Sequence, residues 1–200
     1  MINKGKDNSR FIEAVAFAAD THAEDFRKGT TIPYLSHLLQ VAGLAYEFGA
    51  NEDEAIGALL HDAAEDAGGE AMLEQIEAKF GPIVAGIVRE NSDSLAEIGA
   101  EKAPWKQRKI DYLKGIETKS KSALLVSLSD KVHNTRALIA DTRNVGESHW
   151  KRFNAEKSEL LWYYQSLAES FEARKEDYPE LKPAIAELSF AVKTLHSSAA

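Results

Sequence analysis

Four residues that can bind a metal ion interrupt stretches that are otherwise apolar. His37 lies near the start of an apolar segment, His61 and Asp62 follow the apolar residues 58–60, and Asp130 ends another apolar run. Burying such groups costs several kcal/mol unless they are paired. Two imidazoles and two carboxylates form an N₂O₂ ligand set that suits Mn²⁺, Fe²⁺ or Zn²⁺ and leaves positions for water and a substrate oxygen. We therefore predict a metal site for catalysis at His37, His61, Asp62 and Asp130.

Two further acids follow the His61-Asp62 pair. Glu65 lies four residues after His61, and Asp66 four residues after Asp62, so on a continuous helix the four side chains form two neighbouring stripes. Four titratable groups on one helical turn are difficult to explain by packing, and such a patch needs a cation. Glu65 and Asp66 themselves are either part of the site or solvated acids.

The elements that must position these residues are predicted to be helices. Apolar residues recur at helical spacing throughout the chain, with no run of alternating β-branched residues, so we predict an all-α bundle. Asn51 and Glu54 form a predicted capping box, and Pro82 suits a first helical turn. The expected helices cover 8–24, 35–49, 51–67, two segments flanking 81–82, a segment from 104, then 123–138, 150–176 and 179–195. Residues 27–34 and 92–104 are predicted loops, the latter functional or mobile.

Composition limits the classes of function. The chain has 200 residues, 44% of them hydrophobic and 28% charged, which predicts a single domain over residues 1–200. The net charge of −8 argues against nucleic acid or an anionic membrane as partner, and the lack of cysteine excludes thiol chemistry. No apolar run approaches the ~18 residues of a membrane helix, and the N-terminus does not resemble a signal peptide. Cytoplasm is the default expectation; the sequence leaves the oligomeric state open.

The spacing of these residues resembles the HD superfamily of metal-dependent phosphohydrolases. Three blocks, RKGTTIPYLSH, ALLHDAAED and LSDKVHNTR, are similar to the hydrolase domain of RelA/SpoT homologues and to the small alarmone hydrolases, including the metazoan SpoT type. The resemblance covers about residues 10–175, with the helix at 179–195 expected to pack on that domain. It implies a helical HD-type fold and hydrolysis of the 3′-pyrophosphate of guanosine tetra- and pentaphosphate. We expect no attached synthetase domain.

The resemblance also assigns roles to individual residues. It implies that His37, His61, Asp62 and Asp130 hold one ion, usually Mn²⁺, and that Glu65 and Asp66 orient or deprotonate the attacking water. It implies a nucleotide-binding set made of Arg27, Lys28, Lys131, Asn134 and Arg136.

Several alternatives stay open from the residues alone. Another HD phosphohydrolase, such as a 5′-nucleotidase or phosphodiesterase, and a catalytically silent nucleotide-binding HD protein share the main pattern. Residues 90–93 (ENSD) depart from the usual V-T form near the nucleoside, which leaves guanine or adenine preference open. Arg136 either contacts the nucleotide or pairs with an acid, and His133 either supports the metal site or packs in the core.

Overall fold

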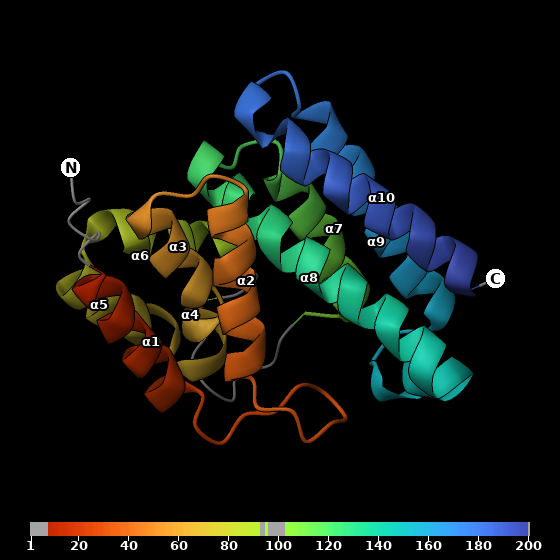
Figure 1. Cartoon of the computed structure of the whole chain (residues 1–200), viewed down its shortest axis with the longest axis horizontal. Coiled ribbons are helices and arrows are strands. Elements are labelled where there is room, and N and C mark those ends of the chain that lie inside the picture. The colour runs from red at the N-terminus through yellow and green to blue at the C-terminus, as the bar shows by residue number, and fades with distance from the viewer. Residues whose placement is uncertain (1–7, 93–94, 96–102, 200) are drawn as a thin grey trace, which may run out of the picture.

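The computed structural model describes residues 8–92, 95 and 103–199, and the regular elements in this part of the chain are helices (Figure 1). The all-α prediction is therefore confirmed; the extended pairing seen in the described segments is an isolated bridge between Phe26 and Pro33. The elements are α1 (Ser9–Thr21), α2 (Leu35–Glu47), α3 (Glu52–Leu59), α4 (Ala63–Ala67), α5 (Gly69–Phe80), α6 (Pro82–Asn91), α7 (Trp105–Gly115), α8 (Lys121–Val145), η1 (Gly146–Arg152), α9 (Lys157–Ala173), η2 (Pro179–Leu181) and α10 (Lys182–Ala199). Most of the predicted loop at 92–104 lies outside the described residues.

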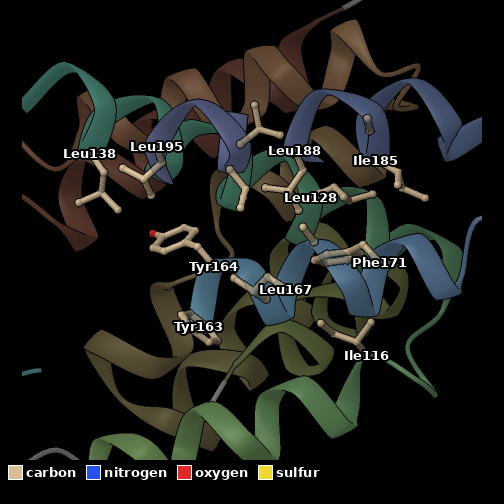
Figure 2. Packing of buried hydrophobic residues seen from close by; sticks show 14 of the residues in the cluster. Ile116, Leu128, Leu138, Tyr163, Tyr164, Leu167, Phe171, Ile185, Leu188 and Leu195 are labelled. Atoms are coloured by element: carbon tan, nitrogen blue, oxygen red, sulfur yellow. The ribbon is translucent and has the colours of Figure 1, made fainter. Parts of the chain in front are cut away.

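The long helix α8 lies between two packed groups of helices (Figure 1). On one side, its Val126 joins a core formed largely by α1 to α6. On the other side, Leu124 and Leu128 join a core with α9 and α10, where Leu167 and Leu188 are fully buried (Figure 2). The position of α8 matters for function because Asp130 follows these core residues directly and is itself buried.

Local sequence signals explain several helix ends. The side chain of Asn51 accepts a hydrogen bond from the Glu54 amide, and the Glu54 carboxylate accepts one from the Asn51 amide, so the predicted capping box is confirmed. Pro82 occupies the first turn of α6, as expected. The buried Glu54 carboxylate also accepts a hydrogen bond from Ser122 at 2.8 Å, which fastens the start of α3 to α8.

Several predicted helix boundaries are wrong. The helix expected over 123–138 is part of α8, which continues to Val145. The helix expected from 51 to 67 is interrupted, because α3 ends at Leu59 and α4 begins at Ala63. Between them the Ala63 amide donates to the Leu60 carbonyl, which forms a turn with an i to i+3 hydrogen bond. The imidazole of His61 lies 2.7 Å from the Ala58 carbonyl, which would accept the amide of residue 62 in a continuous helix. His61 and Asp62 therefore lie in a tight turn and not in mid-helix.

A further correction concerns the helix expected to begin at Trp150. Trp150 lies in the short η1 segment, Phe153 is extended with ψ 154°, and α9 begins only at Lys157. Glu156 forms a capping box with Glu159, which fixes the later start. Within the described ranges, no helix is both long and apolar enough to cross a membrane.

Candidate active site

The structure brings His37, His61, Asp62 and Asp130 together at the junction of α2, the turn between α3 and α4, and α8. The Nε2 atom of His61 lies 3.0 Å from Oδ2 of Asp62 and 3.6 Å from Oδ1 of Asp130. The Nε2 atom of His37 lies 3.7 Å and 3.4 Å from the same two oxygens. Both imidazoles and Asp130 are buried, whereas the side chain of Asp62 is 25% exposed. The donor atoms of His37, His61 and Asp62 therefore lie within 4.8 Å of one another, and Oδ1 of Asp130 lies within 3.6 Å of both imidazole Nε2 atoms.

This donor set fits a divalent ion. Metal–ligand bonds of about 2.1 Å place neighbouring donors roughly 3.0–3.4 Å apart, which is close to the observed separations. The Nε2 atom of His61 is buried and makes no hydrogen bond to any residue that the structure describes, while its Nδ1 atom faces the Ala58 carbonyl at 2.7 Å. An imidazole with Nδ1–H bonded to a carbonyl presents a lone pair on Nε2, the arrangement expected of a metal ligand. The cluster is therefore able to bind a metal.

The four groups strongly affect one another's protonation in the metal-free protein. Burial lowers the pKa of His61, but the carboxylates of Asp62 and Asp130 outweigh it and hold that pKa well above its usual value. Burial likewise opposes ionisation of Asp62, yet His61 and His37 hold its pKa well below the usual range. The pKa of Asp130 is also lowered against burial, first by Lys131 and then by the two histidines. Both carboxylates are thus ionised and ready to bind a cation.

Neighbouring side chains hold the two carboxylates in place. The hydroxyl of Tyr34 donates to Oδ2 of Asp62 at 2.6 Å, and burial raises the pKa of Tyr34, so this proton is retained. Lys131 lies 2.7 Å from the other oxygen of Asp130, Oδ2, and Asn134 donates to Oδ1. Tyr34 lies at the start of α2, whereas Lys131 and Asn134 share α8 with Asp130.

A cavity of about 1050 Å³ adjoins the cluster at His37. It is lined by the loop before α2, by α2 and α8, and by parts of α7, η1 and α9. Its wall contains the five residues predicted to bind a nucleotide, Arg27, Lys28, Lys131, Asn134 and Arg136. Six basic residues line it against two acidic ones, Glu47 and Asp141, although the whole chain has a net charge of −8. The local charge therefore favours a polyanionic ligand of small size.

The predicted residues differ in how they are held within this cavity. Arg27 donates to the side-chain oxygen of Asn134 at 2.7 Å, which joins the loop to α8. Arg136 is exposed and pairs with Glu187 of α10 at 2.8 Å, so an acid does accompany it. Lys28 is exposed.

Glu65 and Asp66 lie on α4, just after the His61-Asp62 turn, and do not line this cavity. Glu65 is partly buried and lies 4.0 Å from the Arg108 guanidinium of α7, whereas Asp66 is exposed. The Asp66 amide bonds to the Asp62 carbonyl at 3.0 Å, so Asp66 follows Asp62 by one helical turn, whereas His61 lies outside α4. The place of Glu65 and Asp66 on α4 is set by the turn.

The sequence left the role of His133 open and did not indicate several other residues of the site. His133 lies with Nδ1 2.8 Å from Nδ1 of His37, and burial, then His37 and Arg27, lowers its pKa to about 4. The cavity wall also includes further basic and aromatic residues, Trp105, Lys109, Arg152, Tyr163 and Tyr164. The sequence spacing of these cavity residues is that of ordinary core helices, so it did not indicate a binding site. Only His133 was indicated by its position, because it follows Asp130 by nearly one helical turn.

Comparison with known proteins agrees with this geometry. A family model described as HD domain matches residues 14–169. The guanosine-3′,5′-bis(diphosphate) 3′-pyrophosphohydrolase MESH1 of Drosophila melanogaster is 33% identical over 138 residues, which cover 68% of this chain and 73% of that protein. MESH1 of Mus musculus is 34% identical over 139 residues, 67% and 72% of the two chains. The solved structure of a metazoan SpoT orthologue that hydrolyses ppGpp superposes with a TM-score of 0.71, covering 96% of both chains at 25% identity.

Proposed function

Because the chain belongs to the HD domain family, we propose that it is a metal-dependent hydrolase that removes the 3′-pyrophosphate of guanosine 3′,5′-bis(diphosphate) and of the corresponding pentaphosphate. The observation that carries the proposal is the position of the His/Asp cluster at one end of a basic cavity in an acidic chain. The polyphosphate specified by the relatives' names matches the charge of that cavity. We take residues 1–200 as one hydrolase domain, on which α10 packs through α8 and α9.

The metal ligands in this proposal are His37, His61, Asp62 and Asp130. A mixed imidazole and carboxylate set favours Mn²⁺, with Fe²⁺ or Zn²⁺ as other candidates. When bound, the ion polarises a phosphoryl oxygen and lowers the pKa of water toward neutrality. Tyr34 contributes by fixing the Asp62 carboxylate through its 2.6 Å hydrogen bond.

Glu65 and Asp66 are the proposed groups that orient the attacking water and accept its proton. Both follow directly from the turn that carries the ligands His61 and Asp62, and this connection keeps them near the cluster. Hydrolysis adds the water oxygen to the phosphorus nearest the sugar and breaks its bond to the 3′-oxygen, so a free 3′-hydroxyl and pyrophosphate result. A positioned carboxylate contributes typically about 10²–10⁴-fold to such a step.

The basic side chains are the proposed substrate contacts. Two aspartates neutralise the charge of a divalent ion, so the cluster alone attracts a polyphosphate only weakly. Arg27, Lys28, Lys131 and Arg136 supply positive charge along the cavity, with Asn134 as a polar contact. Arginine is suited to this role because its fork matches phosphate oxygens and also stacks on a base.

A substrate panel tests the proposal. Mn²⁺-loaded protein is assayed with guanosine and adenosine 3′,5′-bis(diphosphates), their 5′-monophosphates and cyclic dinucleotides, and products are separated by ion-exchange chromatography. We expect GDP and pyrophosphate from the guanosine 3′,5′-bis(diphosphate), and loss of both products on chelation of the metal. Absence of pyrophosphate release, or turnover confined to the monophosphates or cyclic compounds, would refute the proposal.

A further inference from the structure

His133 and His37 meet ring to ring at the edge of the His/Asp cluster. Their Nδ1 atoms are 2.8 Å apart and their ring centroids 4.7 Å, with His37 on α2 and His133 on α8. At this separation one hydrogen lies between the two nitrogens, because two lone pairs would repel and two hydrogens would clash. The pair therefore has two arrangements, which differ in which ring donates.

We propose that His133 is a positioning residue that accepts the Nδ1 hydrogen of His37 and so keeps the lone pair of His37 on Nε2. This inference rests on the proposed metal site, because Nε2 of His37 is the atom that faces Asp62 and Asp130. In the opposite arrangement His37 carries its hydrogen on Nε2, where it points toward the position of the ion and prevents coordination. The hydrogen bond from His133 thus selects the tautomer of His37 that can bind a metal.

The local backbone explains why His37 needs a partner from another helix. His61 obtains its acceptor from the carbonyl three residues earlier, that of Ala58. The equivalent carbonyl for His37 is that of Tyr34, which already accepts the amides of His37 at 2.8 Å and Leu38 at 3.3 Å as α2 begins. The acceptor for His37 must therefore come from elsewhere in the fold.

Helix α8 supplies that acceptor together with a ligand. Asp130 and His133 are three residues apart on α8 and so lie on the same face of the helix. The side chain of Asp130 lies 3.4 Å from Nε2 of His37, while His133 contacts the opposite nitrogen of the same ring. One turn of α8 therefore contacts both nitrogen atoms of the His37 imidazole. A residue at position 133 that served only in packing would not need to contact Nδ1 of His37.

Two variants separate the hydrogen bond from the space that the ring fills. His133→Phe keeps a ring and removes the acceptor, and we expect it to bind Mn²⁺ about 10- to 100-fold more weakly, as measured by electron paramagnetic resonance of free Mn²⁺. His133→Asn places an amide oxygen close to the original Nδ1 position and should restore most of the affinity. His196→Phe, on α10 and away from the cluster, is the matched control and should bind Mn²⁺ normally.

A second readout observes the tautomers directly. In Zn²⁺-bound wild-type protein, two-bond ¹H–¹⁵N correlation spectra should show His37 protonated at Nδ1 and His133 at Nε2. Wild-type affinity in His133→Phe, or a hydrogen on Nδ1 of His133, would overturn the positioning role. If His37→Ala loses Mn²⁺ while His133→Phe does not, only this role fails; if His37→Ala also binds normally, the proposed metal site fails with it.

Discussion

The substitution Asp130→Asn tests the metal site with little change in the shape of the side chain. Asp130→Asn removes the negative charge from a buried side chain whose Oδ1 atom lies 3.4 and 3.6 Å from the two ligand imidazoles. Mn²⁺ at 100 times its dissociation constant stabilises the wild-type protein by about 2.7 kcal/mol. At roughly 2–4 °C per kcal/mol for a chain of this size, the melting temperature should rise by about 5–11 °C.

The variant should lose most of that rise. Removing a side chain that supports a metal ligand lowers metal affinity by up to about 100-fold, and we expect Asp130→Asn to lose at least that much. A loss of about 100-fold leaves the site half occupied at the same Mn²⁺ concentration. The stabilisation then falls to about 0.4 kcal/mol, or a rise of roughly 1 °C. Because the shift is measured within each variant, differences between the metal-free proteins cancel.

The assay is differential scanning fluorimetry with and without Mn²⁺, accompanied by pyrophosphate release from guanosine 3′,5′-bis(diphosphate). Asp111→Asn, which alters an exposed carboxylate on α7, is the control and should keep the full rise. A full rise with wild-type turnover in Asp130→Asn would show that Asp130 is not a ligand and would refute the site as proposed.

Three further predictions follow from the site and the packing. Glu65→Gln should keep Mn²⁺ affinity but lower kcat by about 10²–10⁴-fold, and unchanged kcat would exclude Glu65 as the group that handles water. The folded, metal-free protein holds the pKa of His61 well above 6.5, so the stability that this shift contributes is complete below pH 6.5 and is lost as pH rises through the folded pKa. Between pH 6.5 and the folded pKa, Mn²⁺ must displace a proton from His61, so the apparent Mn²⁺ affinity should rise about tenfold per pH unit. A flat profile in calorimetric titrations would contradict this prediction. Gly57→Ala should lower the free energy of unfolding in urea by about 1–3 kcal/mol, because the new Cβ would lie 2.7 Å from Cγ2 of Ile87. The control Gly86→Ala, where a Cβ meets no atom within 4 Å, should not destabilise the protein. Equal stabilities of the two variants would contradict the close packing of α3 on α6.

The sequence was sufficient for the helical class and for several local features. Helical spacing of apolar residues predicts an all-α chain, and the Asn51 capping box is visible because its partner Glu54 is three residues away. The types and order of His37, His61-Asp62 and Asp130 also indicate metal chemistry before any geometry is known. Such signals are readable because they depend on residue chemistry and on neighbours within one turn.

Only the tertiary structure decided how those residues are arranged. The break between α3 and α4 moves His61 and Asp62 into a turn, and periodicity did not reveal it because the imidazole of His61 takes a backbone carbonyl that a continuous helix would use. The pairing of His37 with His133, 96 residues apart, arises from the packing of α2 on α8. The basic cavity likewise combines side chains from the loop before α2 and from α2, α7, α8, η1 and α9. Contacts of this kind join residues distant in sequence, so their partners are chosen by the fold and not by local spacing.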